Sequence, residues 1–186
     1  PAINDQVWNT DLADQLFLRL AMLSPTFRTI GDQAMTPMLA RRWQRVDPLT
    51  LVFELDPRAR WHDGTPVTAR DVVFTWQLMM DPVVGKGRVV MEPVASVEAV
   101  GTGKVRVRFK RPVAEQLYLF SFNMQPLPAH LLEGVAPAAI ARSDFATGPI
   151  GNGPYRYVRR VPGQFVELRA DPTFFLGTPT IARVVM

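Results

Sequence analysis

The chain has 186 residues, of which 47% are apolar and 20% are charged, and its formal net charge is +4. This apolar content is enough for one large domain or two small ones with a buried core. Because the chain has no cysteine, it can form neither a disulfide framework nor a zinc site with thiolate ligands. No apolar run approaches the roughly 18 residues that a membrane-spanning helix needs. The arginines are scattered along the chain, which does not favour nucleic-acid binding.

The N-terminal part of the chain predicts a helix and then a β-hairpin. Thr10 or Asp11 is a suitable cap for a helix over residues 10–23. The apolar residues of that segment recur at helical spacing: Leu12, Leu16, Leu20 and Leu23. Residues 41–56, RRWQRVDPLTLVFELD, contain two strand-like runs on either side of Asp47-Pro48. Since proline presets the backbone angle of a turn, this segment predicts a hairpin.

The next segment, WHDGTPVTARDVVFTW from Trp61 onward, contains a turn followed by a helix. Asp63-Gly64 is a turn dipeptide, and Thr68 with Asp71 three residues later resembles a capping box. A helix is therefore predicted to begin at Ala69 and to end before the next proline. Its predicted buried face consists of Val72, Trp76 and Met79 or Met80.

His62 and Asp63 are neighbours in this turn, a combination that also occurs in catalytic and metal sites. Either role requires a nucleophile or further ligands, and the other histidine of the sequence is His130. The sequence contains neither the GxSxG nor the HExxH pattern. A structural turn is the favoured interpretation. A metal-dependent hydrolase that uses His62, Asp63 and His130 is the weaker alternative.

The second half of the chain predicts two more hairpins and a short helix between them. Gly101-Thr102-Gly103 is the turn of the first, whose strands cover residues around 96–100 and 104–109. The helix follows over residues 114–120. Pro162-Gly163 is the turn of the second hairpin. One more strand is predicted over residues 181–186.

Residues 148–154, GPIGNGP, have the glycines of a phosphate-binding loop but lack its other features. The prolines remove amide donors that such a loop needs, and no Gly-Lys-Ser or Gly-Lys-Thr follows. Because glycine permits a close approach of the backbone, a turn that closes on a ligand or on another strand is the better interpretation.

Taken together, several of these segments resemble a known family. The family is extracellular solute-binding family 5, the peptide- and nickel-binding class of bacterial ABC importers. Five segments resemble motifs of this family and occur in the family's order and at its usual spacing: PMLARRW, LTLVFELDPRARWHDGTPVTARDVVFTW, VRFKRPVAEQL, PIGNGPYRYV and VELRADPTFFLGTPTI. The resemblance extends along nearly the whole chain. Two positions depart from the family pattern: Phe174-Phe175 replaces a frequent Tyr-Trp, and Asn152 replaces a commoner Thr.

The resemblance implies an α+β, or mixed α/β, fold that is part of a two-lobed architecture like that of periplasmic binding proteins, with an additional inserted domain. By this resemblance, residues 1–15 begin the first lobe, residues 16–121 form the inserted domain, and residues 122–186 return to the first lobe. The second lobe is expected outside this sequence. The chain is therefore expected to be an N-terminal part of a longer protein.

The resemblance also places several polar loops at the ligand cleft between the lobes. Amide side chains can donate to and accept from peptide groups, methionine adapts to the shape of a ligand, and glycine admits a close approach. The candidate ligand-binding residues are Asn4, Gln6, Trp8, Asn123, Met124, Gln125, Gly151, Asn152 and Gly153. Ordinary loop chemistry is the alternative interpretation of each of them.

The function that the resemblance implies is capture of a small solute, most directly a short peptide, and its delivery to an ABC permease in the membrane. Enzymatic activity, a metal, a cofactor and nucleic-acid binding are not expected. A monomer is expected, either periplasmic or anchored outside the cytoplasm by a lipid. The alternative is the ligand-sensing domain of a cytoplasmic transcription regulator, because similar domains also occur fused to DNA-binding modules.

Overall fold

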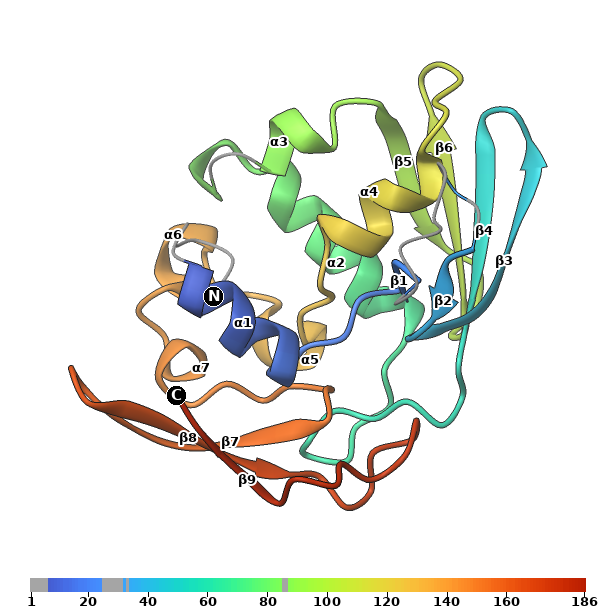
Figure 1. The fold of residues 1–186 in the computed structure, drawn as a ribbon. Helices are drawn as coiled ribbons and strands as arrows, with labels where there is room; N and C mark the ends of the chain where they lie inside the picture. Colours follow the sequence, from blue (N-terminus) through green and yellow to red (C-terminus); the bar gives the residue numbers. More distant parts are fainter. Residues whose placement is uncertain (1–6, 25–31, 33, 85–86) are drawn as a thin grey trace.

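The computed structural model describes residues 7–24, 32, 34–84 and 87–186, with side chains from residue 10 onward. Within this part, the helices and strands form a mixed α/β fold (Figure 1). The helices are α1 (Val7–Leu16), α2 (Ala69–Met80), α3 (Gly87–Val90), α4 (Gln116–Phe122), α5 (Ala129–Leu132), α6 (Pro137–Ile140) and α7 (Asp144–Thr147), with a short 3-10 helix η1 (Pro82–Val84). The strands are β1 (Ala21–Met22), β2 (Thr36–Pro37), β3 (Ala40–Asp47), β4 (Thr50–Leu55), β5 (Val94–Ala99), β6 (Lys104–Phe109), β7 (Tyr155–Val161), β8 (Phe165–Ala170) and β9 (Arg183–Val185).

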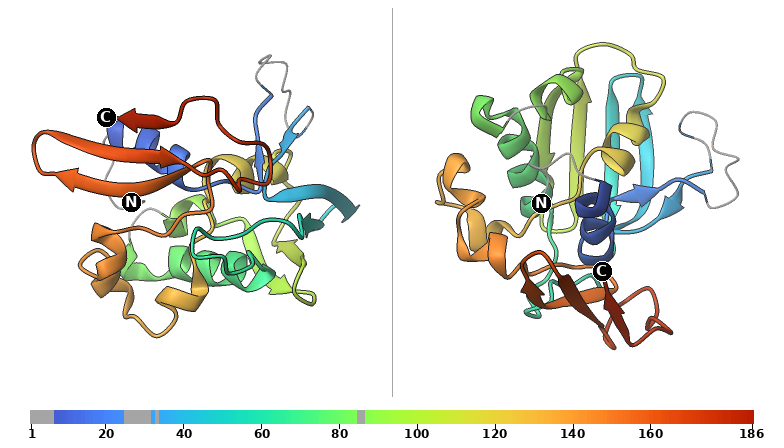
Figure 2. Two further views of the ribbon diagram at one scale, coloured as in Figure 1. Left: turned by 90° about the horizontal axis from the view of Figure 1, so that it is seen from below. Right: turned by 60° about the vertical axis from the view of Figure 1, so that its left-hand side comes forward.

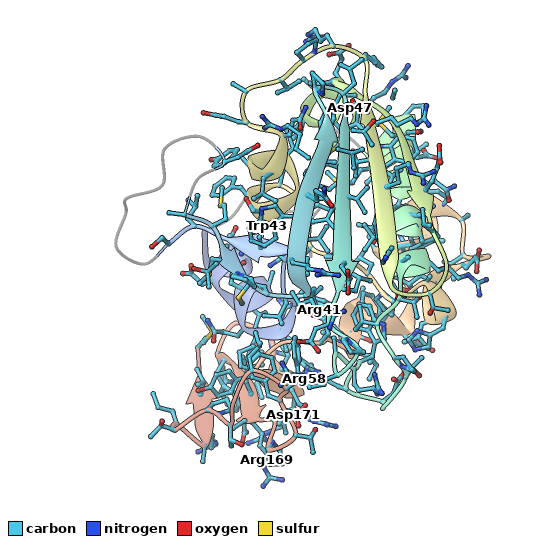
Figure 3. All side chains as sticks on the ribbon, turned by 90° about the vertical axis from the view of Figure 1, so that its right-hand side faces the viewer. Arg41, Trp43, Asp47, Arg58, Arg169 and Asp171 are labelled. Atoms are coloured by element: carbon cyan, nitrogen blue, oxygen red, sulfur yellow. The ribbon has the colours of Figure 1, made fainter. Side chains whose placement is uncertain are left out.

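The four-stranded sheet has the order β3-β4-β6-β5, and every neighbouring pair is antiparallel. Along β4 the side chains of Leu51, Phe53 and Leu55 are buried, and those between them are half-buried. This period of two gives the sheet one apolar face. α2 and α4 cover that face, where the ring of Phe53 lies 5.5 Å from the ring of Phe120 in α4 (Figure 1). In Figure 3 the opposite face is turned to the viewer, and none of the described helices covers it.

α2 begins at Ala69, the residue that the capping pattern predicts. One oxygen of the Asp71 carboxylate accepts the backbone N–H of Thr68 at 2.7 Å, which completes the predicted capping box. The other oxygen accepts the backbone N–H of Ala129 at 2.9 Å. The carboxylate therefore ties the start of α2 to α5 as well as capping the helix.

The first helix differs from the prediction at both ends. It covers Val7–Leu16 instead of residues 10–23. Beyond it the chain is extended, and Ala21–Met22 pair with Thr36–Pro37 as a two-stranded sheet. The leucine spacing is confirmed as a sign of helix for Leu12 and Leu16, but it was wrong for Leu20 and Leu23, which lie beyond the end of α1. All four leucines are buried or half-buried.

Tertiary hydrogen bonds explain why this helix ends early. The carbonyl of Leu16 accepts the backbone N–H groups of Asn152 and Gly153, at 2.9 and 2.8 Å. The backbone N–H of Leu18 donates to the side-chain oxygen of Asn152 at 2.8 Å. Because these backbone groups have partners outside a helix, the chain can leave the helix without losing hydrogen bonds.

The second antiparallel sheet has the order β7-β8-β9. In Figures 1 and 2, α1 lies against this sheet, and the two elements are in contact through β7. Val166 and Leu168 of β8 are buried. A single hydrophobic cluster extends from Leu16 through the four-stranded sheet to Leu168, so the two sheets share one core. The domain boundaries at residues 15/16 and 121/122 stay a prediction.

The three hairpins predicted from the sequence are confirmed, with turns after Asp47, Ala99 and Val161. The strand predicted at 181–186 is confirmed as β9, and the helix predicted at 114–120 is α4, shifted by two residues. The four-residue helices α3, α5, α6 and α7 were not predicted. Helices of one turn are too short for a hydrophobic period to appear in the sequence.

Candidate functional site

Two of the candidate loops, residues 123–125 and 151–153, lie around the C-terminal end of α1. Two of the candidates lie outside the described residues: Asn4 and Gln6. Trp8 lies in α1, where only its backbone is described. Residues 123–125 follow α4, and residues 151–153 precede β7. Both loops make hydrogen bonds to residues 14–18, so the fold brings them to the same end of α1.

The loop after α4 is attached to α1 through Gln125. The amide nitrogen of Gln125 donates to Asp14 at 2.7 Å and to the carbonyl of Phe17 at 3.2 Å. Met124 is buried in the core, with 1% of its surface exposed. Asn123 is half-buried at the end of α4, and its side chain makes no hydrogen bond with the described residues. Of this loop, Asn123 has the amide most available to a further partner.

The segment 151–153 approaches α1 more closely than a side chain would allow. A Cβ atom at Gly151 would overlap the carbonyl oxygen of Leu16, and one at Gly153 would lie 2.5 Å from the carbonyl oxygen of Gln15. Asn152 between them is buried, and its side-chain nitrogen has no hydrogen-bond partner among the described residues. The predicted close approach is confirmed, but the turn closes on the end of a helix and not on a strand.

His62 is the other neighbour of this segment. Its Nδ1 accepts the backbone N–H of Gly151 at 3.2 Å, and its Nε2 lies 3.0 Å from the carbonyl of Gly153. Its own backbone N–H donates to the carbonyl of Gly151 at 2.7 Å. Burial lowers the pKa of His62; the Gly153 carbonyl opposes this shift, and the charge of Arg156 adds to it. These contacts agree with the interpretation of His62 as part of a structural turn. The sequence around His62 could not show that its ring binds residues about 90 positions further along the chain.

Arg156 extends the network from His62 to the last strands. Its guanidinium donates to the carbonyl of His62 at 2.6 Å and to the carboxylate of Asp171 at 3.1 Å. Asp171 also accepts the backbone N–H and the hydroxyl of Thr173. Burial raises the pKa of Asp171, but the hydrogen bonds from Thr173 and Arg156 outweigh it, and the pKa lies below its usual value. In Figure 3, Asp171 lies at the end of the molecule that carries the second sheet.

Asp63 and His130 form a pair 2.7 Å apart, and both are partly exposed. His62 is not part of this pair, because both of its ring nitrogens face the backbone of residues 151–153. In the described part of the chain, no group of three or more histidine, cysteine or acidic side chains could hold a metal ion. The geometry therefore gives no support to the hydrolase alternative.

A cavity of about 460 Å³ lies between α1, α7 and the β7–β8 hairpin. Its walls are mostly apolar and include Leu12 and Leu16 from α1 and Val166 from β8. Thr147, Tyr157 and Arg160 add polar groups to the lining. The volume falls within the range of about 300–1,000 Å³ of small-molecule sites. The described candidate residues are not part of this lining.

Comparison with known proteins identifies the family. A family model described as the middle part of bacterial extracellular solute-binding proteins, family 5, matches residues 34–186. The chain therefore belongs to this family. A Brucella ovis protein named as an ABC transporter peptide-binding protein is 33% identical over 141 residues, which cover 75% of this chain and 26% of that protein. The chain thus spans about a quarter of the length of this curated relative.

Three solved structures show the same fold. The oligopeptide-binding protein AppA of Bacillus subtilis, in complex with a nonapeptide, is 25% identical, with a TM-score of 0.87 over 99% of this chain and 36% of AppA. MoaA of A. tumefaciens R10, in complex with mannopinic acid, is 26% identical, with a TM-score of 0.85 over 100% of this chain and 37% of MoaA. NikZ of Campylobacter jejuni, in complex with Ni(L-His), is 28% identical, with a TM-score of 0.79 over 92% of this chain and 33% of NikZ.

These comparisons confirm both the resemblance and the expected fold class. The chain corresponds to about a third of each solved structure, as expected for part of a larger two-lobed protein. The solute-binding proteins of ABC importers are not enzymes. The relatives described above give no support to the transcription-regulator alternative. Among the described helices, none has both the length and the apolar character needed to cross a membrane.

Proposed function

We propose that the protein containing this chain is the substrate-binding component of a bacterial ABC importer, which captures a short peptide and delivers it to a membrane permease. The observation that carries this proposal is the match of 99% of the chain to an oligopeptide-binding protein that holds a nonapeptide. The name of the Brucella relative points to the same ligand class. The opine and nickel complexes of the other two structures have the same fold, so the fold by itself does not choose the ligand.

In this proposal the chain supplies part of one wall of the ligand site. Asn123 is the best described candidate for a direct contact, because its amide is half-buried and unused by the described residues. Gln125 and Met124 hold the loop in place through Asp14 and the core. The segment 151–153 holds the wall against α1. The N-terminal candidates Asn4, Gln6 and Trp8 complete the proposed ligand region.

Capture follows from closure of two lobes around the peptide. A ligand stabilises the closed state only to the extent that it makes more contacts there than in the open state. One lobe alone provides part of those contacts and cannot exclude water from the ligand. The protein is proposed to act as a monomer outside the cytoplasm, where the family of extracellular solute-binding proteins works.

Native mass spectrometry of the intact protein, purified from its host without denaturation, tests this proposal. The expected spectrum contains the protein with non-covalent adducts that release amino-acid sequence ladders on fragmentation. Adducts that consist only of an opine, a sugar or a metal complex would contradict the peptide assignment. The spectrum also reports whether the protein is a monomer.

A further inference from the structure

The ring of His62 joins two segments that are distant in sequence, the turn at residues 61–65 and the segment 151–153. Three hydrogen bonds cross this junction: Nδ1 of the ring accepts one, Nε2 makes the second with the carbonyl of Gly153, and the backbone N–H of His62 donates the third. On the far side, residues 152 and 153 donate to the carbonyl of Leu16. The segment 151–153 is thus held between His62 and the end of α1. The loop 123–125, the other described part of the proposed ligand wall, is hydrogen-bonded to the same end of α1.

The partners of the ring allow only one protonation state. The backbone N–H of Gly151 is a donor, so Nδ1 must carry a lone pair and not a proton. The carbonyl of Gly153 is an acceptor, so Nε2 must carry the proton. Both bonds are satisfied by the neutral imidazole with its proton on Nε2. A doubly protonated ring would direct an N–H at the N–H of Gly151.

The packing leaves the segment little room to adjust to such a change. A Cβ atom at Gly151 would lie 3.0 Å from Cε1 of His62 and would overlap the carbonyl of Leu16. The segment therefore already touches both neighbours. If the ring becomes a second donor toward Gly151, either the ring or the segment has to move away.

The charged groups around the ring of His62 are engaged with other partners. Arg156 from β7 binds the carbonyl of His62, and Asp171 after β8 is occupied by Arg156 and Thr173. Asp63, in the same turn as His62, is occupied by His130 from α5. The burial of the ring keeps its pKa below the usual value, although the two carboxylates act in the opposite direction.

We propose that His62 is a positioning residue for the segment 151–153, and that it holds this segment only as the neutral imidazole with its proton on Nε2. Protonation of the ring releases the segment from the turn at 61–65 while the four-stranded sheet stays folded. The consequence for the ligand wall rests on the proposed function. The local release itself can be tested without any ligand.

The direction of the pH effect follows from linkage. In the closed junction the segment 151–153 is bound to the ring of His62, and in the open junction it is released from the ring. The pKa of His62 is lowered in the closed junction, so the open junction binds a proton more readily. The closed junction is therefore most stable above the ordinary histidine pKa. It loses stability as the pH falls below that value and until the pH reaches the lowered pKa. Within this window the equilibrium changes by up to about tenfold per pH unit.

Hydrogen–deuterium exchange of the intact protein, followed by mass spectrometry between about pH 8 and pH 4.5, measures this release over the histidine range. After correction for the intrinsic pH dependence of exchange, the peptide that contains residues 151–153 is expected to lose protection on acidification. The β3–β4 hairpin is expected to keep its protection, which distinguishes local release from global unfolding. A wild-type profile without this acid step, or with the same step in the β3–β4 hairpin, overturns the proposal.

Two variants assign the step to the ring of His62. In His62→Gln, the side-chain amide can still donate to Gly153 but does not titrate, so protection is expected at neutral pH without the acid step. In the control His130→Gln, the acid step is expected to remain, because His130 faces Asp63 and not the segment. An unchanged acid step in His62→Gln, or its loss in His130→Gln, contradicts the assignment. Neither outcome depends on a ligand. The exchange experiment therefore tests the role of His62, and native mass spectrometry tests the ligand class, so either proposal can fail without the other.

Discussion

Gly151 occupies a position where even the methyl group of alanine would clash with the backbone of Leu16. A Cβ atom there would overlap the carbonyl of Leu16, which is itself fixed by the N–H groups of residues 152 and 153. Gly151→Ala is therefore expected to lower the free energy of unfolding by about 1–3 kcal/mol, the usual cost of overpacking. Denaturant unfolding of the two proteins measures the difference.

Gly103→Ala is the matched control for this substitution. Gly103 lies in the turn between β5 and β6, and a Cβ atom added there meets nothing within 4 Å. The expected change is within about 0.5 kcal/mol, as for other surface substitutions. An equal loss of stability in both variants would mean that the close approach of residue 151 to Leu16 does not cause the effect.

Asp71 is a second residue whose role depends on burial. It is 3% exposed, and its two oxygens accept the backbone N–H groups of Thr68 and Ala129. Asp71→Ala leaves both donors without this partner, so we expect a loss of about 2–4 kcal/mol in the free energy of unfolding. Asp11→Ala, at an exposed position in α1, is the control and should change stability by less than about 0.5 kcal/mol. A loss below about 1 kcal/mol in Asp71→Ala would show that water replaces the carboxylate.

The helices and strands that depend on turn or capping residues a few positions away were predictable from the sequence. The hairpins follow from their turn residues, and α2 follows from Thr68 and Asp71, which lie within one helical turn. The end of α1 was not predictable, because the partners of Leu16 and Leu18 are more than 130 residues away along the chain. The family resemblance suggested candidate loops for the ligand region, and that assignment stays a prediction. Because the contacts between two of these loops and residues 14–18 join distant parts of the chain, the sequence did not show that both loops meet at the end of α1.

α4 has a cap from a distant residue. The side chain of Glu115, directly before the helix, makes no capping hydrogen bond, whereas Asp32 accepts the backbone N–H groups of Leu117 and Tyr118 at 2.8 and 3.3 Å. Asp32 also binds Arg45 in β3. Asp32→Ala is expected to cost about 0.5–2 kcal/mol, as the loss of a helix cap does.

Chemical denaturation of Asp32→Ala beside Glu115→Ala measures this contribution. Glu115 is exposed and adjacent to α4, so its replacement removes a similar charge without removing the cap. If Glu115→Ala lowers the stability as much as Asp32→Ala does, the effect is one of charge near the helix and not of capping.

The second sheet contains an acid-sensitive cluster. Glu167 in β8 lies between Arg183 in β9 and Arg159 in β7, and hydrogen bonds from the two arginines lower its pKa from 4.5 to about 2. Because the folded-state pKa is lowered, Glu167 contributes stability above its unfolded pKa and loses that contribution as the pH falls toward about 2.

Glu167→Gln is therefore expected to have a lower melting temperature than the wild type at pH 7. The difference should shrink as the pH falls from about 4.5 to about 2, where the wild-type carboxyl also becomes neutral. Thermal unfolding, followed by circular dichroism at several pH values, measures it. A difference that stays constant down to pH 2 would contradict a role for the charge of Glu167.

The described part of the chain forms one packed body, and we propose that it contains part of one wall of the ligand site. The core cluster is continuous from Leu16 to Leu168, so both sheets are expected to unfold together. The chain covers about a third of each solved relative, and those relatives hold their ligands as larger proteins. The contacts that complete the site and close it over a peptide are therefore expected outside residues 1–186.

Isothermal titration calorimetry of the intact protein and of residues 1–186, each with the peptide found by mass spectrometry, tests this division of the site most directly. Circular dichroism first establishes that the shorter chain is folded. We expect saturable heat from the intact protein and essentially none from residues 1–186. Comparable affinity in both would contradict the account, because the ligand site would then lie wholly within these 186 residues.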